Sequence, residues 1–147
     1  MVRKASAVWN GTLKEGKGTI STDSGVLSKT QYSFSTRFEN GAGTNPEELI
    51  AAAHAGCFTM ALSGQLTNAG FKPESLETTA EVTLEKLEAG FTITKVHLDV
   101  TARVPGADQA AFDKAAANAK AGCPISRLLK AEITMTARLA GDRAVTA

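Results

Sequence analysis

Polar and apolar residues alternate in the middle of the chain, over positions 76–84 and again over 96–104. Alternation with a period of two is typical of strands that have one buried face. The segment Glu88-Ala89-Gly90 supplies a turn between these two strands. The first residues of the returning strand are out of phase with the rest, so we expect a β-bulge near Thr94-Lys95. A last strand over 133–139 shows the same alternation.

The first third of the chain also has patterns typical of strands. Short runs at 7–9 and 18–21 are separated by glycines and charged residues, which favour turns. The segment Tyr32–Phe38 alternates as well, and we expect a strand whose polar face carries Arg37. A glycine-containing loop over 39–45 is predicted to follow it.

A long helix is predicted next, because the segment from Leu49 to Phe71 contains no Asp, Glu, Lys or Arg. Asn45 and Pro46 provide an N-cap and a first helical residue ahead of it. The helix is apolar nearly all round, which predicts a buried central helix. A transmembrane span is the rival interpretation. We reject it, and expect no membrane association, because polar residues such as His54 interrupt the segment.

One sheet covers only one side of a helix that is apolar on all sides. The small residues at positions 51–53, 55 and 56 would let a second helix approach closely. We therefore predict that a second copy of the chain covers the remaining side, in an obligate homodimer.

Asp108 is expected to cap another helix over 109–121, and Cys123 stands before Pro124 at the start of a short third helix. This order of elements predicts an α+β fold, with antiparallel sheets packed on the long central helix and helices on one face of the sheet. The 147 residues are expected to form a single domain, 1–147. The tail from Gly141 is predicted to be loose.

Charge and cysteine content limit the possible partners and compartments. The net charge is +1 and the charges are interspersed, so nothing favours binding to nucleic acid. Two cysteines are too few for a disulfide-rich secreted scaffold, and no apolar signal-peptide region follows the N-terminus. We expect a cytosolic protein. In that compartment cysteines are buried and inert, metal-bound or catalytic.

The two cysteines have different surroundings. Cys57 lies in the middle of the long helix, where a free cysteine is often a small buried apolar residue with a raised pKa. Such a thiol stays inert unless a cation reaches it. Cys123 occupies an N-cap, where the partial positive charge of a helix end favours a thiolate. For Cys123 the alternative is a cap that happens to be cysteine.

Metal binding is disfavoured, because Cys57 and Cys123 lie 66 residues apart and form no C-x-x-C pair. His54 precedes Cys57 by three residues, on about the same helix face. His97 is expected on the outward face of its strand. Both histidines are expected to be structural or solvated. The alternative for His54 is a base for Cys57, as in a cysteine hydrolase.

Two motifs, 43–58 and 120–126, carry a family resemblance. The first includes Ala53-His54-Ala55-Gly56-Cys57-Phe58 and the second reads Lys-Ala-Gly-Cys-Pro-Ile-Ser. In this order and spacing they resemble the OsmC/Ohr family of organic hydroperoxide peroxidases. The similarity extends to 17–22 and 32–39, and so covers nearly the whole chain. The setting of Arg37 resembles the OsmC branch more than the Ohr branch.

The resemblance implies a thiol peroxidase that protects against oxidative and osmotic stress. In it Cys57 would be the peroxidatic cysteine and Cys123 the resolving one, and the two would form a disulfide during the cycle. Arg37 would activate the first thiol, and Glu47 would orient Arg37. The resemblance also implies an intertwined homodimer and a lipoyl-type dithiol as reductant. It implies no metal and no other cofactor.

The spacing of two of these residues adds an inference. Glu47 and Cys57 are ten residues apart, which is about 15 Å along a straight helix. A carboxylate that far away does not orient an arginine against the thiol unless the arginine spans part of the gap. We therefore expect Glu47 to act from the other subunit, with the two central helices antiparallel.

The substrate class is predicted from apolar side chains. Candidate pocket walls are Phe34, Phe38, Phe58, Met60 and Phe71, which would favour alkyl or aryl hydroperoxides over hydrogen peroxide. The alternative is that all five belong to the core. A different function class also fits an apolar groove, namely a non-enzymatic binding protein for small hydrophobic ligands.

Overall fold

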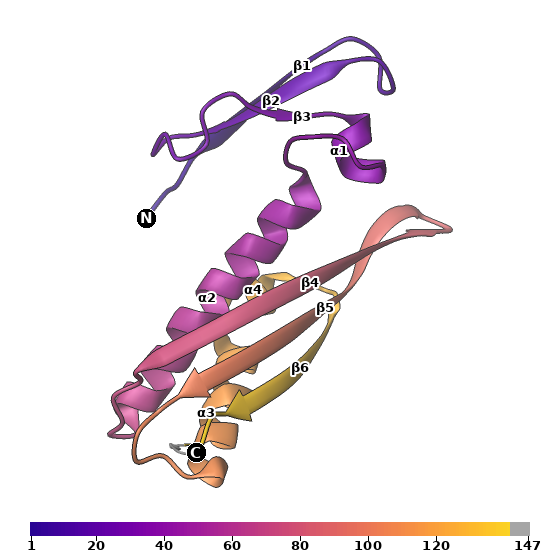
Figure 1. Cartoon of the computed structure of the whole chain (residues 1–147). Coiled ribbons are helices and arrows are strands. Elements are labelled where there is room, and N and C mark those ends of the chain that lie inside the picture. The colour runs from indigo at the N-terminus through magenta and orange to yellow at the C-terminus, as the bar shows by residue number, and fades with distance from the viewer. Residues whose placement is uncertain (142–147) are drawn as a thin grey trace. The chain divides into compact units, whose positions relative to one another are not determined.

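The computed structural model describes residues 1–141, and its contacts group the chain into two compact units, Met1–Leu49 and the part from Ile50 onward. Each unit contains one three-stranded sheet (Figure 1). The expectation of a single domain over 1–147 stays a prediction. The tail expected to be loose lies, beyond Gly141, outside the described residues.

The first unit is built on an antiparallel sheet in the order β1-β2-β3. Its strands are β1 (Ala5–Asn10), β2 (Lys17–Thr22) and β3 (Thr30–Tyr32). The first two contain the predicted runs at 7–9 and 18–21. Gly18 permits the rings of Trp9 and Tyr32 to meet, because a Cβ there would lie 2.5 Å from each ring. The ring centroids are 5.4 Å apart.

The strand predicted over Tyr32–Phe38 is wrong, because β3 ends at Tyr32 and a short helix, α1 (Phe34–Phe38), follows. Ser33 makes the change of direction. Its hydroxyl accepts a hydrogen bond from the Thr36 N–H at 3.3 Å, and its own N–H donates to Thr36 Oγ1 at 2.8 Å. This reciprocal pair is a capping box, which fixes the start of a helix. Arg37 therefore lies in a helical turn and not on a strand.

The second unit contains β4 (Ser75–Leu87), β5 (Gly90–Arg103) and β6 (Glu132–Leu139), in the order β4-β5-β6. The predicted hairpin is confirmed, with antiparallel pairing of β4 and β5. The predicted bulge is confirmed too. Thr83 pairs with Lys95 and the next residue pairs with Ile93, so Thr94 is the extra residue.

Among the described strands, every pair is antiparallel except β5 and β6, which are parallel. Their arrowheads lie at the same end of the sheet in Figure 1. A parallel connection needs a crossover, and α3 (Gln109–Gly122) with α4 (Pro124–Leu128) provides it. Asp108 caps α3 as predicted, since its Oδ1 accepts from the Ala111 N–H at 2.8 Å. The expectation of antiparallel sheets is therefore wrong for β6, because its alternating pattern indicated its buried face but not its direction.

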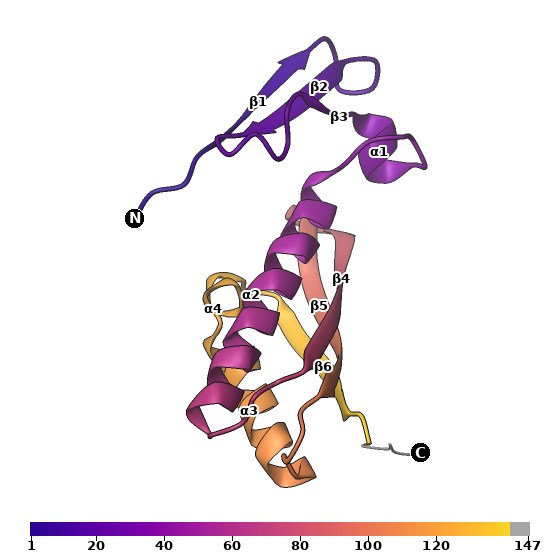
Figure 2. The same cartoon turned by 60° about the vertical axis from the view of Figure 1, so that its left-hand side comes forward.

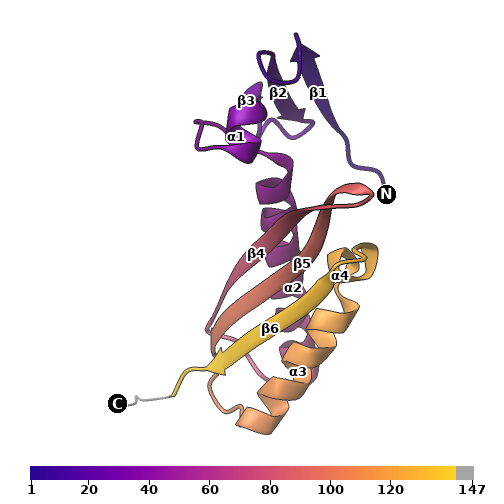
Figure 3. The same ribbon diagram turned by 90° about the vertical axis from the view of Figure 1, so that its right-hand side faces the viewer.

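The core of the second unit lies between one face of the sheet and the helices. Figure 2 shows α2, α3 and α4 on the same side of the sheet, and Figure 3 shows the sheet from another direction, with β6 beside β5. The largest core side chains come from α2 (Pro46–Asn68), β5 and α3, and are Phe58, Leu62, Leu66, Val96, Leu98, Val100 and Phe112. The predicted one-sided covering of the sheet is confirmed.

A single copy of the chain buries only one face of α2. The buried residues are His54, Phe58, Leu62 and Leu66, four positions apart, whereas Met60 is 79% exposed. With 23 residues and a mean hydropathy of 1.3 in its most apolar window, α2 also has the length and composition of a membrane span, as core helices of soluble proteins often do. The opposite face of this apolar helix is therefore left open by a single copy.

Candidate functional site

The residues predicted from the sequence form two clusters, and the first lies in the first unit. Arg37 donates two parallel hydrogen bonds to Glu47, from Nε to Oε1 at 3.0 Å and from Nη2 to Oε2 at 2.9 Å. This bidentate geometry orients the guanidinium as well as pairing its charge. The Glu47 side chain is only 13% exposed and that of Arg37 is 37% exposed. Arg37 thus keeps other N–H donors that do not face Glu47.

Hydrogen bonds made by the side chains of Thr44 and Asn45, at the start of α2, hold this pair in place. Asn45 is the predicted N-cap, and its Oδ1 accepts from the Glu48 N–H at 2.8 Å. Its Nδ2 donates to the Thr36 carbonyl at 2.9 Å, which ties α1 to the helix start. Thr44 donates to the Glu48 carboxylate at 2.8 Å. Glu48 is therefore engaged by Thr44, whereas Glu47 is the partner of Arg37.

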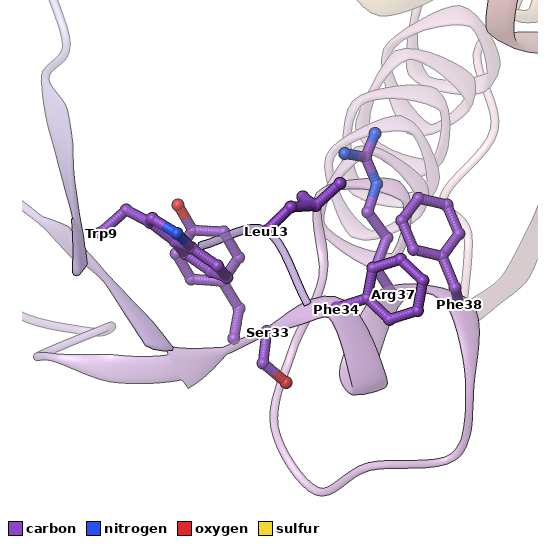
Figure 4. Close-up of a pocket in the computed structure, with 7 residues that line it drawn as sticks. Trp9, Leu13, Ser33, Phe34, Arg37 and Phe38 are labelled. Atoms are coloured by element: carbon purple, nitrogen blue, oxygen red, sulfur yellow. The ribbon is translucent and has the colours of Figure 1, made fainter. Parts of the chain in front are cut away.

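An apolar pocket of about 260 Å³ lies beside Arg37 in the same unit (Figure 4). Its lining residues are Trp9, Leu13, Tyr32, Ser33, Phe34, Arg37 and Phe38. Phe34 and Phe38 are two of the predicted pocket walls. Trp9, Leu13 and Tyr32 were not predicted, because they come from β1, β3 and the β1–β2 loop and only the fold brings them together.

The other three predicted pocket walls do not line this pocket. Phe58 is fully buried in the core of the second unit, and Phe71 packs against that core. Met60 is exposed on α2. The core interpretation was therefore right for Phe58 and Phe71.

The second cluster contains both cysteines and lies in the second unit. Cys57 is half-buried on α2, Cys123 is buried at the junction of α3 and α4, and both thiols are free. Burial raises the pKa of Cys57, a hydrogen bond from the Ile125 backbone lowers it, and contact with the Cys123 thiol raises it. The net direction is upward. Within one copy, Cys57 is therefore a protonated, weakly nucleophilic thiol that needs a cation for activation.

Cys123 is the N-cap of α4, as predicted. Its Sγ accepts from the Ser126 N–H at 3.4 Å and lies 3.2 Å from Ser126 Oγ. Ser126 was not singled out as functional from the sequence. The available signal was its position three residues after an N-cap, where its N–H faces the capping atom.

His54 meets the same serine from α2. The ring is fully buried, and Nε2 lies 2.8 Å from Ser126 Oγ. Burial lowers the pKa of His54, so the ring is neutral at pH 7. Among the described residues Nδ1 has no hydrogen-bond partner. The polar contact of His54 is therefore with Ser126, and the role of a base bonded directly to Cys57 is not supported.

His97 has the structural surroundings that the sequence predicted. It lies on the outward face of β5, with Nδ1 2.7 Å from Thr134 Oγ1 and Nε2 3.2 Å from Thr136 Oγ1. The described residues contain no group of three or more His, Cys, Asp or Glu side chains placed to hold a metal ion.

Comparison with known proteins gives consistent results. A family model described as OsmC-like protein matches residues 39–138. The chain is 57% identical to peroxiredoxin OsmC of Escherichia coli over 137 residues, 93% of this chain and 96% of that protein. It is 29% identical to the organic hydroperoxide resistance protein of Xanthomonas axonopodis over 128 residues, 86% and 87% of the two chains. An OsmC-like protein from Vibrio cholerae superposes with a TM-score of 0.76 at 21% identity, covering 93% of this chain and 99% of that one.

Proposed function

Because this chain belongs to the OsmC family, we propose that it is a peroxidase that reduces organic hydroperoxides to alcohols through a two-cysteine cycle. The names of its relatives, a peroxiredoxin and an organic hydroperoxide resistance protein, support the peroxidase activity. The observation that carries the cycle is the contact between the Cys57 and Cys123 thiols, which the fold brings together across 66 residues of sequence.

Each step of the cycle balances with the groups at hand. The Cys57 thiolate attacks the distal oxygen of the hydroperoxide, the O–O bond breaks, and the alkoxide takes up a proton and leaves as alcohol. Cys57 is then a sulfenic acid. Cys123 attacks its sulfur, the S–S bond forms and water leaves. An external dithiol of the lipoyl type restores both thiols by exchange. No metal or prosthetic group enters any step.

Arg37 and Glu47 are proposed to activate Cys57. A raised thiol pKa falls when a guanidinium stands near the sulfur, because the cation stabilises the thiolate. Glu47 and Cys57 are ten residues apart on α2, so the Arg37–Glu47 pair of one subunit is assigned to the Cys57 of the partner subunit. Mixing Cys57→Ser chains with Glu47→Ala chains tests this. Heterodimers should regain activity above both parents, and no regain contradicts the composite site.

The apolar pocket beside Arg37 is the observation that favours organic hydroperoxides as substrates. Its walls are mostly carbon, from Trp9, Tyr32, Phe34 and Phe38, and so suit an alkyl or aryl group next to a charged donor. Cumene hydroperoxide is expected to react faster than hydrogen peroxide. A preference for hydrogen peroxide would remove the pocket from the substrate model.

The open face of α2 is proposed to meet a second copy of the chain in a homodimer. A Cβ added at Gly56 would meet no heavy atom within 4 Å outside its own helical turn, so a single copy leaves open space there. Gly56→Leu should favour the helix of an isolated chain but obstruct a close helix partner. We expect the dimer mass to fall toward the monomer mass in Gly56→Leu and not in the control Ala117→Leu, an exposed site on α3. Unchanged mass would argue against this interface.

A thiol titration tests the cycle directly. Two free thiols per chain should be lost on adding one equivalent of cumene hydroperoxide, with formation of an intramolecular disulfide, and dihydrolipoamide should restore them. A cytosolic location, where thiols are kept reduced, fits this chemistry. The alternative function is a binding protein that uses the same apolar pocket for a small hydrophobic ligand. A binder keeps both thiols when peroxide is added.

A further inference from the structure

A continuous line of polar contacts runs inside the second unit from α2 to the cysteines. His54 Nε2 lies 2.8 Å from Ser126 Oγ, Ser126 Oγ lies 3.2 Å from Cys123 Sγ, and Cys123 contacts Cys57. His54, Ser126 and Cys123 are all buried. A hydroxyl between a base and a thiol is the arrangement through which a proton passes from sulfur to nitrogen.

We propose that Ser126 and His54 form a proton relay that deprotonates Cys123 when it attacks the oxidised Cys57. This inference rests on the two-cysteine cycle proposed above and assigns a role that the cycle leaves open. Ser126 touches the reacting sulfur, and His54 acts through Ser126 as a positioning residue and proton acceptor.

The directions of the hydrogen bonds are possible both before and after such a proton transfer. Ser126 has one hydroxyl hydrogen, so it donates to one neighbour and accepts from the other. Before transfer it accepts from the Cys123 S–H and donates to neutral His54 Nε2. After transfer Nε2–H donates to Ser126, which donates to the Cys123 sulfur. The same three atoms thus serve both states without movement of the backbone.

Packing alone does not account for His54. An imidazole with one buried nitrogen that lacks a partner among the described residues destabilises a folded protein, whereas an apolar side chain of similar size fits such a site without that loss. His97 shows the contrast, because hydroxyls bind both of its ring nitrogens. The buried histidine is therefore better explained by the proton that its Nε2 accepts.

Electrons and protons balance over the step. The Cys123 sulfur forms the S–S bond with Cys57 while the S–O bond of the sulfenic acid breaks. The thiol proton passes to Ser126 Oγ as the Ser126 proton passes to His54 Nε2. Hydroxide leaves from Cys57 and takes up a proton, which makes water, and His54 returns its proton to solvent. The sum is one disulfide and one water from a thiol and a sulfenic acid.

The test separates the two half-reactions in the full-length protein. Stopped-flow measurements follow Cys57 oxidation by cumene hydroperoxide and then disulfide formation, and dimedone traps any sulfenic acid that persists. In Ser126→Ala we expect Cys57 oxidation within about twofold of wild type and disulfide formation slowed by about 10- to 100-fold at pH 7. Ser126→Thr keeps the hydroxyl and should remain close to wild type. Thr134→Val, which removes one of the two hydroxyl partners of His97, is the matched control.

The pH dependence separates a relay from a merely structural role. Without the relay, Cys123 loses its proton to solvent, so disulfide formation in Ser126→Ala should recover toward the wild-type rate as the pH rises to 9. Burial lowers the pKa of His54, whereas burial and then the neighbouring Cys123 thiol raise the pKa of Cys57. A displaced Cys123 would slow the step equally at pH 6 and pH 9.

The outcomes are distinct. Wild-type rates of disulfide formation in Ser126→Ala, or a loss that does not change with pH, would overturn the relay but leave the cycle standing. If the wild type itself forms no disulfide with peroxide, the proposed function fails instead. If circular dichroism shows that Ser126→Ala is unfolded, His54→Gln gives the same test with Ser126 and Cys123 in place. A wild-type rate in that variant would overturn the relay too.

Discussion

Arg37 donates two hydrogen bonds of 3.0 and 2.9 Å to Glu47, so a carboxylate that is itself mostly buried fixes the plane of the guanidinium. A lysine at this position keeps the positive charge but lacks the two parallel N–H donors of the guanidinium. Arg37→Lys should therefore slow Cys57 oxidation by cumene hydroperoxide about 100-fold, with little change in the rate of disulfide formation. The control is Arg138→Lys, since Arg138 pairs with Asp99 on the sheet surface. An unchanged oxidation rate in Arg37→Lys would remove Arg37 from thiol activation.

His54 predicts how stability depends on pH. Its folded pKa lies below the ordinary value of 6.5 because it is buried. Below pH 6.5 the unfolded chain takes up a proton that the folded chain does not, so stability falls as the pH drops below 6.5 toward the folded pKa, by up to about 1.4 kcal/mol per pH unit. Urea unfolding from pH 7.5 to 5 measures it. His54→Gln should lose this slope and His97→Gln should keep it; equal slopes in all three proteins would contradict the prediction.

The Cys57 thiol should respond to removal of its neighbour. Contact with Cys123 is one of the causes that raise the pKa of Cys57, after burial. In Cys123→Ser the midpoint of Cys57 alkylation by iodoacetamide should therefore move to lower pH, because serine carries no competing charge. The same two proteins in urea should alkylate alike. A midpoint that stays or rises would show that the thiols do not interact.

A pair of matched substitutions tests the core. Phe58 is fully buried between α2 and the sheet, whereas Phe91 is 56% exposed on β5. Phe58→Ala should lower the free energy of unfolding by about 3–5 kcal/mol. Phe91→Ala should change it by less than about 1 kcal/mol. Thermal and urea unfolding of both variants, followed by circular dichroism, measure the difference. Similar losses in the two would mean that α2 packs differently.

The second unit was the easier one to predict from sequence. Its strands each bury one face, so the alternation over β4, β5 and β6 marks them and even indicates the bulge at Thr94. Strand direction is not part of that pattern. The parallel pairing of β6 depends on where the α3–α4 crossover delivers the chain, and alternation of side chains carries no information about it.

The error at α1 has a local cause. The side chains alternate as in a strand at Tyr32, Phe34, Thr36 and Phe38. However, the hydroxyls of Ser33 and Thr36 each accept a hydrogen bond from the other residue's backbone N–H, and this pair starts a helix. Glu or Gln is usual where Thr36 stands, so the capping signal was weak. The Cys57–Cys123 pair was assigned through resemblance. Ser126 was missed because it contacts His54, which lies 72 residues away in the sequence. The periodicity of a sequence gives no information about contacts between residues so far apart along the chain.

The contact between Cys57 and Cys123 also has a consequence for chain entropy. A disulfide between them would close a loop that spans 66 residues of sequence. Closing a loop of that size lowers the conformational entropy of the unfolded chain, which stabilises the folded state by about 4 kcal/mol. By thermodynamic linkage, folding stabilises the disulfide by the same free energy by which the disulfide stabilises the folded chain. The oxidised protein should therefore melt at a higher temperature than the reduced one and resist monothiols. We expect a reductant that closes its own ring, as a dithiol does, to overcome that resistance, so the loop that the fold closes would favour dithiols over monothiols.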